Sequence, residues 1–288
     1  MMQNNRLPLD NECRIQIGEF CCALRFNADA GYVKSARDYF ENFNSEQEPD
    51  IEVAVNLMPH KEDVTIPSSL FVNKTIDGNS FDYHNGLLKG MIDPRSKKCT
   101  IEVDFVLLGG SARIFEQFLF QLYYTLIAEK YGKQKPVRFL LHSCSVLRAG
   151  QGYVFVGPSG SGKSTIAGLS TSFSVLNDEM SLILGENGIF SVQATPFNGF
   201  FRQKKNLKGP LKGIYFIKQA KSAYVKKVSM HDYIPALVQE MVPFMGILTA
   251  EQDIPRSVMI ERALDTLLQV PFYELHFLPD ESFWNCIE

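Results

Sequence analysis

Nine consecutive residues near the middle of the chain have the types and spacing of a phosphate-binding loop. They read GPSGSGKST and match the pattern GxxxxGK[ST]. In such a loop successive backbone N–H groups point into one concavity, and glycines permit the close approach of phosphate oxygens. Lys163 is expected to reach the β- and γ-phosphates, and the Ser164 hydroxyl is expected to ligate magnesium. We therefore predict binding of a purine nucleoside triphosphate, ATP with Mg²⁺, by Gly157, Ser159, Gly160, Ser161, Gly162, Lys163, Ser164 and Thr165.

The segments next to the loop favour this interpretation over a chance match. Residues 153–156, YVFV, have the composition of a buried strand, and residues 163–169 continue as a helix. Strand, loop and helix in this order form the arrangement that phosphate binding requires. The alternative is a glycine-rich turn that carries an exposed lysine.

An acidic pair, Asp178 and Glu179, follows the loop at short range. Fourteen residues separate Lys163 from this pair, which leaves room for one short helix and one strand at 174–177. Ordinary P-loop ATPases place their second acidic motif later in the chain, so the spacing argues against them. Two carboxylates at the end of a neighbouring strand would stand beside the γ-phosphate, where one would hold magnesium and the other would accept a proton from an attacking hydroxyl. The alternative is a solvated Asp-Glu turn.

Four further segments flank the loop: LHSCSV at 141–146, LNDEMSLI at 176–183, TPFNG at 195–199 and VPFYELHFLPDESFW at 270–284. Together with the loop, they resemble the HPr kinase/phosphorylase-like proteins. The resemblance covers residues 139–288 and implies a core related to phosphoenolpyruvate carboxykinase, in which the phosphate loop belongs to a mixed sheet.

The resemblance also implies roles for single residues. His142 corresponds to the histidine that lies close to the phosphates, and Asp178 corresponds to the acid that acts as base toward the phosphate acceptor. Glu179 stands where the family has a second aspartate, a metal neighbour, so its side chain is one methylene longer. The segments with which the family's protein-substrate kinases recognise their acidic partner are not matched, which leaves the acceptor open.

Together these features predict a kinase that transfers the γ-phosphoryl group of MgATP to a hydroxyl, serine-type acceptor on a peptide, a protein or a small molecule. Asp178, His142 and Lys163 are the predicted catalytic residues, and Ser164 and Glu179 are the predicted metal ligands. Two other functions stay open. One is a nucleotide-binding module that has lost transfer, which the glutamate at position 179 would explain. The other is hydrolysis or reverse transfer, with water or inorganic phosphate as the attacking group.

The hydrophobic pattern divides the chain near residues 133–136. In residues 1–135, short strand-like segments between turn signals predict a largely antiparallel sheet with helices. In residues 136–288, strands and helices around the loop predict a nucleotide-binding domain, so the fold class is mixed α/β. The expected strands lie at 13–26, 51–57, 70–76, 80–84, 87–92, 99–105, 139–146, 153–156, 174–177, 182–184, 189–193, 213–217, 224–228 and 272–277, and the expected helices at 31–43, 112–131, 163–169, 230–241 and 256–268.

Composition limits the remaining classes of function. A formal charge of −3 gives no basic surface for nucleic acid. The six cysteines show no CxxC spacing, no signal peptide is recognised and no segment has the ~18 apolar residues of a membrane span, so a cytoplasmic location is expected and a membrane partner is not. A homo-oligomer is left open. Cys144 is expected in the core, and Arg202, Lys204 and Lys205 are expected either to neutralise phosphate or acceptor charge or to form a solvated loop.

Overall fold

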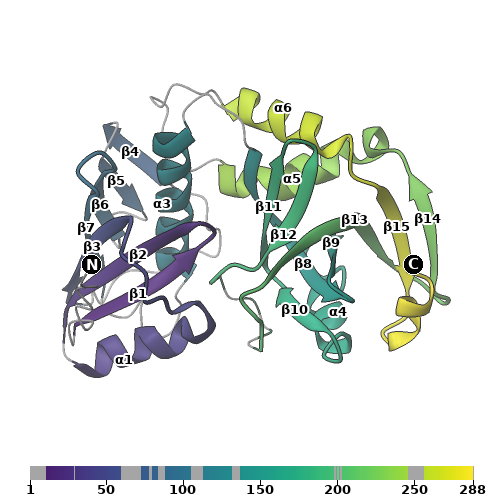
Figure 1. Cartoon of the computed structure of the whole chain (residues 1–288), viewed down its shortest axis with the longest axis horizontal. Coiled ribbons are helices and arrows are strands. Elements are labelled where there is room, and N and C mark those ends of the chain that lie inside the picture. The colour runs from purple at the N-terminus through teal and green to yellow at the C-terminus, as the bar shows by residue number, and fades with distance from the viewer. Residues whose placement is uncertain are drawn as a thin grey trace, which may run out of the picture. The chain divides into compact units, whose positions relative to one another are not determined.

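A computed structural model of the chain shows a mixed α/β protein with two mixed sheets (Figure 1). Its chain divides into two compact units, residues 1–130 with 247–252 and residues 131–246 with 253–288. The structure describes residues 11–28, 30–59, 73–77, 80–83, 88–104, 113–131, 137–197, 199, 201, 203–245 and 256–287.

The first unit is built on a seven-stranded sheet with the order β1-β2-β3-β7-β6-β5-β4. Four of its pairings are antiparallel, as the turn signals predict, but β3 runs parallel to both β2 and β7. A parallel pair needs a crossover connection, and α1 supplies one between β2 and β3. The elements are β1 (Glu12–Ile17), β2 (Phe20–Asn27), α1 (Ala30–Tyr39), η1 (Glu41–Phe43), β3 (Ile51–Met58), β4 (Asn73–Asp77), β5 (Ser80–Tyr83), β6 (Leu88–Asp93), β7 (Lys98–Asp104) and α3 (Arg113–Tyr131).

The second unit contains an eight-stranded mixed sheet and the segments that the sequence singles out. Strand β13 runs parallel to β9 and to β15, and the other pairings are antiparallel. The elements are β8 (Val137–Arg148), β9 (Gln151–Val156), α4 (Lys163–Leu169), β10 (Ser174–Asn177), β11 (Met180–Glu186), β12 (Ile189–Gln193), β13 (Lys208–Gln219), β14 (Tyr224–Val228), η2 (Met230–Tyr233), α5 (Ile234–Met245), α6 (Arg256–Leu267), β15 (Phe272–Phe277) and η3 (Glu281–Asn285).

Strand β8 lies at the centre of the site-bearing part of this sheet. It forms a tight hairpin with β9, in which Ala149 and Gly150 take φ values of 51° and 77°, the left-handed conformation that such turns require. Strands β10 and β11 run one after the other along the opposite edge of β8 and are interrupted at Asp178 and Glu179. The spacing after the loop predicts the acidic pair on the strand next to β9; this is wrong, because β8 lies between β9 and the strands β10 and β11.

The pairing register brings the candidate residues to one level of the sheet. Ser143 of β8 pairs with Val156, the last residue before the loop. On the other edge its backbone N–H donates to the carbonyl of Glu179 at 3.1 Å, and His142 pairs with Met180. The end of β9, the middle of β8 and the break between β10 and β11 therefore form a single row.

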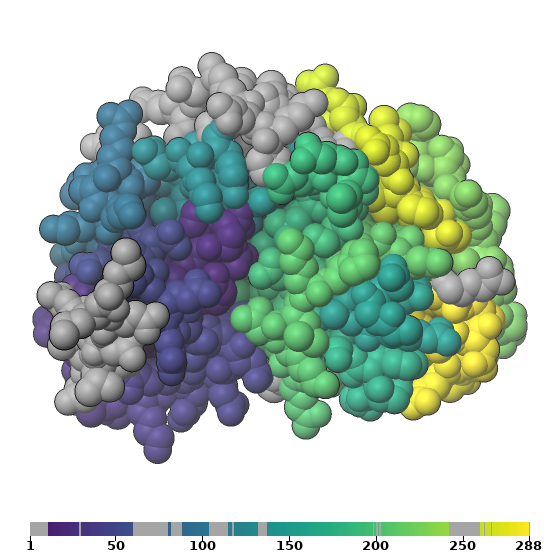
Figure 2. All heavy atoms as spheres, in the orientation of Figure 1, coloured from purple at the N-terminus to yellow at the C-terminus, as the bar shows by residue number. Residues whose placement is uncertain are grey.

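The C-terminal residues pack onto the core around α4. The Trp284 ring contacts Tyr153, Phe155 and Phe173, and its Nε1 donates to Ser170 Oγ at 3.0 Å. Figure 2 shows these yellow C-terminal residues directly beside teal and green residues of the same unit. Trp284 therefore anchors the end of the chain to the core of this unit. Within the described helices, none is both long and apolar enough to cross a bilayer.

Candidate functional site

The loop between β9 and α4 has the backbone of a tight, glycine-dependent turn. Gly160 and Gly162 take φ values of 79° and 113°, which residues with a Cβ adopt only with strain. A Cβ at Gly162 would also lie 2.6 Å from Cζ of Phe277. Gly162 is the N-cap of α4, where no side chain caps the helix. The first N–H groups of α4 have no partners within the helix, and they are thus available to an anion.

Lys163 is folded back onto the loop that carries it. Its Nζ donates to the carbonyl oxygens of Gly157 at 2.6 Å and Pro158 at 3.3 Å, and the residue is 7% exposed. Ser161 Oγ is buried inside the same loop and finds no hydrogen-bond partner among the described residues. Buried hydroxyls normally have partners, and this one packs against Gly157 within the loop.

Ser164 and Asp178 are joined by a hydrogen bond. Ser164 Oγ donates to Asp178 Oδ2 at 3.0 Å, and the backbone N–H of Phe201 donates to the same oxygen at 3.0 Å. Asp178 is 1% exposed. Gly199, from the TPFNG segment, lies so close that a Cβ there would be 2.3 Å from Asp178 Oδ1. Ser164 of the loop and Gly199 of the TPFNG segment therefore both lie against the carboxylate of Asp178.

Buried polar groups hold the TPFNG segment against this carboxylate. Asn177 donates from Nδ2 to the carbonyl oxygens of Thr195 at 3.1 Å and Phe197 at 3.0 Å. Its Oδ1 accepts from the backbone N–H groups of Glu179 and Met180, which shapes the break in the strand. Lys204 Nζ donates to the same two carbonyls at 2.9 and 2.5 Å.

The three basic residues after TPFNG do not act as one group. Lys204 is 4% exposed, so it is not a solvated loop residue, and its ammonium group is bonded to backbone carbonyls. Burying its charge is tolerated because two carbonyl oxygens accept its protons. Lys205 is exposed, and its backbone N–H donates to the carbonyl of Val175. Arg202 lies outside the described residues.

His142 lies between two carboxylates. Its Nδ1 is 2.5 Å from Glu240 Oε2 on α5, and its Nε2 is 3.9 Å from Glu179 Oε2. Burial lowers the pKa of Lys163 from its ordinary value, whereas the charges of Glu240, Glu179 and Asp178 raise it. The histidine, the loop lysine and three carboxylates thus share one electrostatic environment.

Two of these contacts could not be found from local sequence patterns. Glu240 is the only charged residue of α5, IPALVQEMVPFM, and a lone acid in an apolar helix is the one signal that could have indicated it. The sequence indicates Gly199 only as a member of the TPFNG segment, because its closeness to Asp178 depends on tertiary structure. Cys144, in contrast, is buried as expected, and burial raises the pKa of its thiol well above the usual value.

The other predicted binding residues lie on the surface of the loop. Ser159 and Gly160 at its tip and Thr165 in the first turn of α4 are exposed. Among the described residues, no group of three His, Cys, Asp or Glu side chains is arranged to hold a metal ion by itself. The hydroxyl of Ser164 hydrogen-bonds Asp178, which makes Asp178 a metal-ligand candidate alongside the predicted Glu179.

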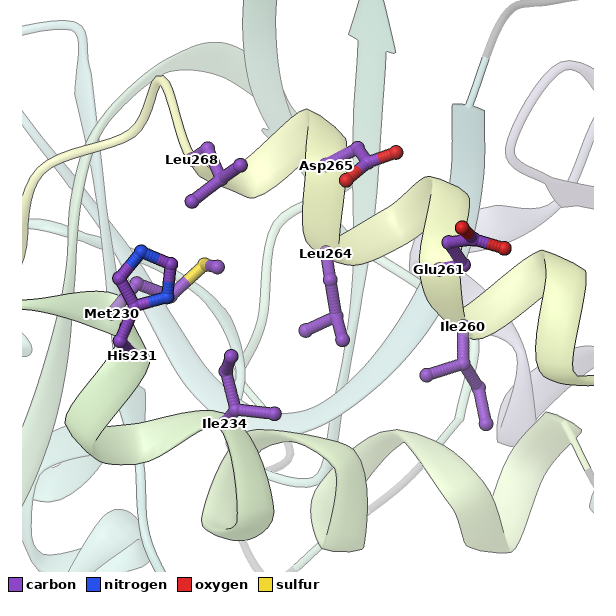
Figure 3. A pocket seen from close by; sticks show the side chains of 8 residues that line it. All are labelled: Met230, His231, Ile234, Ile260, Glu261, Leu264, Asp265 and Leu268. Atoms are coloured by element: carbon purple, nitrogen blue, oxygen red, sulfur yellow. The ribbon is translucent and has the colours of Figure 1, made fainter.

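An open groove of about 440 Å³ lies between α6 and the turn from η2 into α5. Ile260 and Leu264 point from α6 toward Ile234, whereas Glu261 and Asp265 point away (Figure 3). Helix α5 links this groove to the site, because Glu240 follows Ile234 by six residues, roughly 9 Å along a helix axis.

Comparison with known proteins gives a family but no described relative. No curated protein matches the chain. The model of the family described as SynChlorMet cassette protein ScmC matches residues 118–288, which is more than half of the chain and includes the loop, the acidic pair, His142 and Glu240. The chain therefore belongs to the family of the SynChlorMet cassette protein ScmC.

Proposed function

We propose that this chain binds MgATP through the loop at 157–165 and transfers the γ-phosphoryl group to a hydroxyl acceptor. The observation that carries the proposal is the 3.0 Å hydrogen bond between Ser164 and Asp178. A loop serine or threonine and an aspartate together hold magnesium in P-loop nucleotide sites. We also propose that this unit has a core of the HPr kinase and phosphoenolpyruvate carboxykinase type. The order of the motifs and the mixed sheet support this.

The residues present fit both parts of MgATP. For the phosphates, the loop offers backbone amides, the buried Ser161 hydroxyl and the Lys163 ammonium group. For magnesium, Ser164 and Asp178, with Glu179 beside them, supply hard oxygen ligands. Magnesium at phosphate sites keeps waters and needs only one or two protein carboxylates, so the small number of ligands agrees with the proposal.

Each residue then has a role in positioning or proton transfer. Lys163 turns from the carbonyls of Gly157 and Pro158 toward the β- and γ-phosphates and neutralises their charge. Bound magnesium supplies further neutralisation of the phosphate oxygens. Asp178 accepts the proton of the acceptor hydroxyl, since its carboxylate is fixed by Ser164 and by the backbone. Catalysis of this kind consists of positioning and electrostatic stabilisation.

A transfer assay with γ-labelled ATP and magnesium tests this function. Wild-type protein is expected to bind a fluorescent ATP analogue and to move the label to an added hydroxyl-bearing peptide or small molecule, or to water at a lower rate. Asp178→Asn is expected to keep analogue binding and to lose transfer, because the amide cannot accept the proton. Wild-type transfer in that variant would reject the assignment of Asp178 as base.

A second candidate is a nucleotide-binding module without transfer, and one observation favours it. Glu179 replaces the aspartate of the resembled family and is the more exposed member of the acidic pair. Tight analogue binding together with label that stays on ATP, with every acceptor and with water, would select this alternative. Label transferred to inorganic phosphate from a phosphorylated acceptor would select the reverse reaction.

A further inference from the structure

We propose that Glu240 is a positioning residue that fixes the ring of His142 with Nδ1 protonated and Nε2 directed at the phosphate end of the site. The inference rests on the 2.5 Å contact between Glu240 Oε2 and Nδ1 and on the 3.9 Å separation of Nε2 from Glu179 Oε2. A carboxylate can only accept in such a pair, so Nδ1 must donate. The other nitrogen of the ring is then the one that faces the acidic pair.

The two partners come from elements that hold them firmly. His142 lies in β8, where its backbone pairs with Met180 of β11, and α5 packs against β8. Strand and helix fix the backbone positions, but an imidazole ring can still turn about its terminal torsion. The hydrogen bond that Nδ1 donates to Glu240 removes this freedom. Ring orientation by a carboxylate behind Nδ1 recurs at catalytic and metal-binding histidines.

The placement of Glu240 is costly without such a role. Its side chain is 11% exposed, and it is the only charged residue in an otherwise apolar and polar-uncharged helix. A buried carboxylate destabilises a fold unless hydrogen bonds compensate for its lost hydration. The charge of Glu240 also raises the pKa of Lys163. Glu240 therefore influences both the histidine and the loop lysine although it lies outside the loop.

The consequence for the reaction rests on the proposed function. If phosphoryl transfer takes place beside Asp178, the lone pair of a fixed Nε2 accepts a hydrogen bond from the acceptor hydroxyl and helps to orient it there. Removing the carboxylate should reduce the rate of transfer more than nucleotide affinity, since the loop residues that grip the phosphates stay in place. Loss of a carboxylate that orients a histidine typically costs about 10- to 100-fold in activity.

The protonated nitrogen of His142 can be measured directly in the full chain. Long-range ¹H–¹⁵N spectra of protein labelled at histidine, with His142 assigned by its loss in His142→Gln, report which ring nitrogen carries the proton. We expect protonated Nδ1 in wild type and in Glu240→Gln, whose amide oxygen still accepts, and a shift toward the Nε2-protonated form in Glu240→Leu. An unprotonated Nδ1 in the wild-type protein overturns the proposal.

Kinetics separate positioning from a merely structural role. Glu240→Leu should bind the fluorescent ATP analogue within about twofold of wild type and turn over about 10- to 100-fold more slowly, whereas Glu240→Gln should recover part of the rate. Equal loss in both variants, or wild-type turnover in Glu240→Leu, contradicts the inference. Glu261→Gln, an exposed acid on α6, is the matched control. If the wild type neither binds nor turns over ATP, the proposed function fails while the spectra still decide the ring state.

Discussion

Gly199 is the residue at which a single added methyl group should disable the site. Alanine at this position would place its Cβ 2.3 Å from Oδ1, 2.6 Å from Cγ and 2.7 Å from Oδ2 of Asp178. Ordinary contacts of this kind are about 3.5 Å or longer, so the carboxylate or the TPFNG segment must move by about 1 Å. A displacement of that size at a reacting group costs roughly 100-fold in rate, or about 2.7 kcal/mol of transition-state stabilisation.

The assay is phosphate release from MgATP, with fluorescent-analogue binding and thermal unfolding measured alongside. Gly199→Ala is expected to bind the analogue close to the wild-type level and to lose most of its turnover. The matched control is Gly168→Ala in α4, where a Cβ meets nothing within 4 Å and alanine should stabilise the helix by roughly 0.5–1 kcal/mol. Wild-type turnover in Gly199→Ala would show that Asp178 does not have to occupy its present position and would refute its assignment as base.

Three further variants test separate parts of the structure. Lys163→Ala should weaken binding of the ATP analogue by about 100-fold or more, because the cation proposed to contact the phosphates is lost, and calorimetric titration measures this. Lys204→Met should lower the free energy of unfolding by about 1–3 kcal/mol in a urea titration, since two hydrogen bonds from a charged donor are lost and the two carbonyls keep only Asn177 as donor; an unchanged midpoint would contradict its structural role. The hydrogen bond from Lys218 holds the pKa of Glu274 below its ordinary value of 4.5, so its stabilisation is present above that pH and is lost as the pH falls through the lowered pKa. Urea titrations over a pH series should therefore show the stability difference between wild type and Glu274→Gln shrinking in acid, and a constant difference would exclude the linkage.

Local sequence rules identified the elements well because their causes are local. The helix at 163–169 and the strand at 174–177 have the predicted bounds, since a glycine run, a helix start and a short apolar stretch determine them within a few residues. Burial of Cys144 also followed from its apolar neighbours.

The arrangement of strands was less accessible, because register depends on partners far along the chain. Placing the acidic pair on the strand next to β9 overlooked the insertion of β8, which the tight hairpin at Gly150 brings beside β9. The turn signals did not predict the parallel pairings of β3 for the same reason, because a crossover connection has no short-range sequence pattern.

The site itself could be predicted only where a motif names the residue. Lys163, Ser164 and Asp178 come from motif and spacing, and the structure joins Ser164 to Asp178. Glu240 follows Asp178 by 62 residues and contacts His142 only because α5 packs against β8. The sequence offers Lys204 as a cation for phosphate, and in the structure its ammonium group donates to two backbone carbonyls of the TPFNG segment.

Calorimetric titration of the wild-type chain with a non-hydrolysable ATP analogue, with and without magnesium, tests the central claim most directly. The account predicts saturable binding of one nucleotide per chain, tighter when magnesium is present because Ser164 and its acidic neighbours then take part. Absence of binding in both conditions, or binding that is indifferent to magnesium, would contradict it.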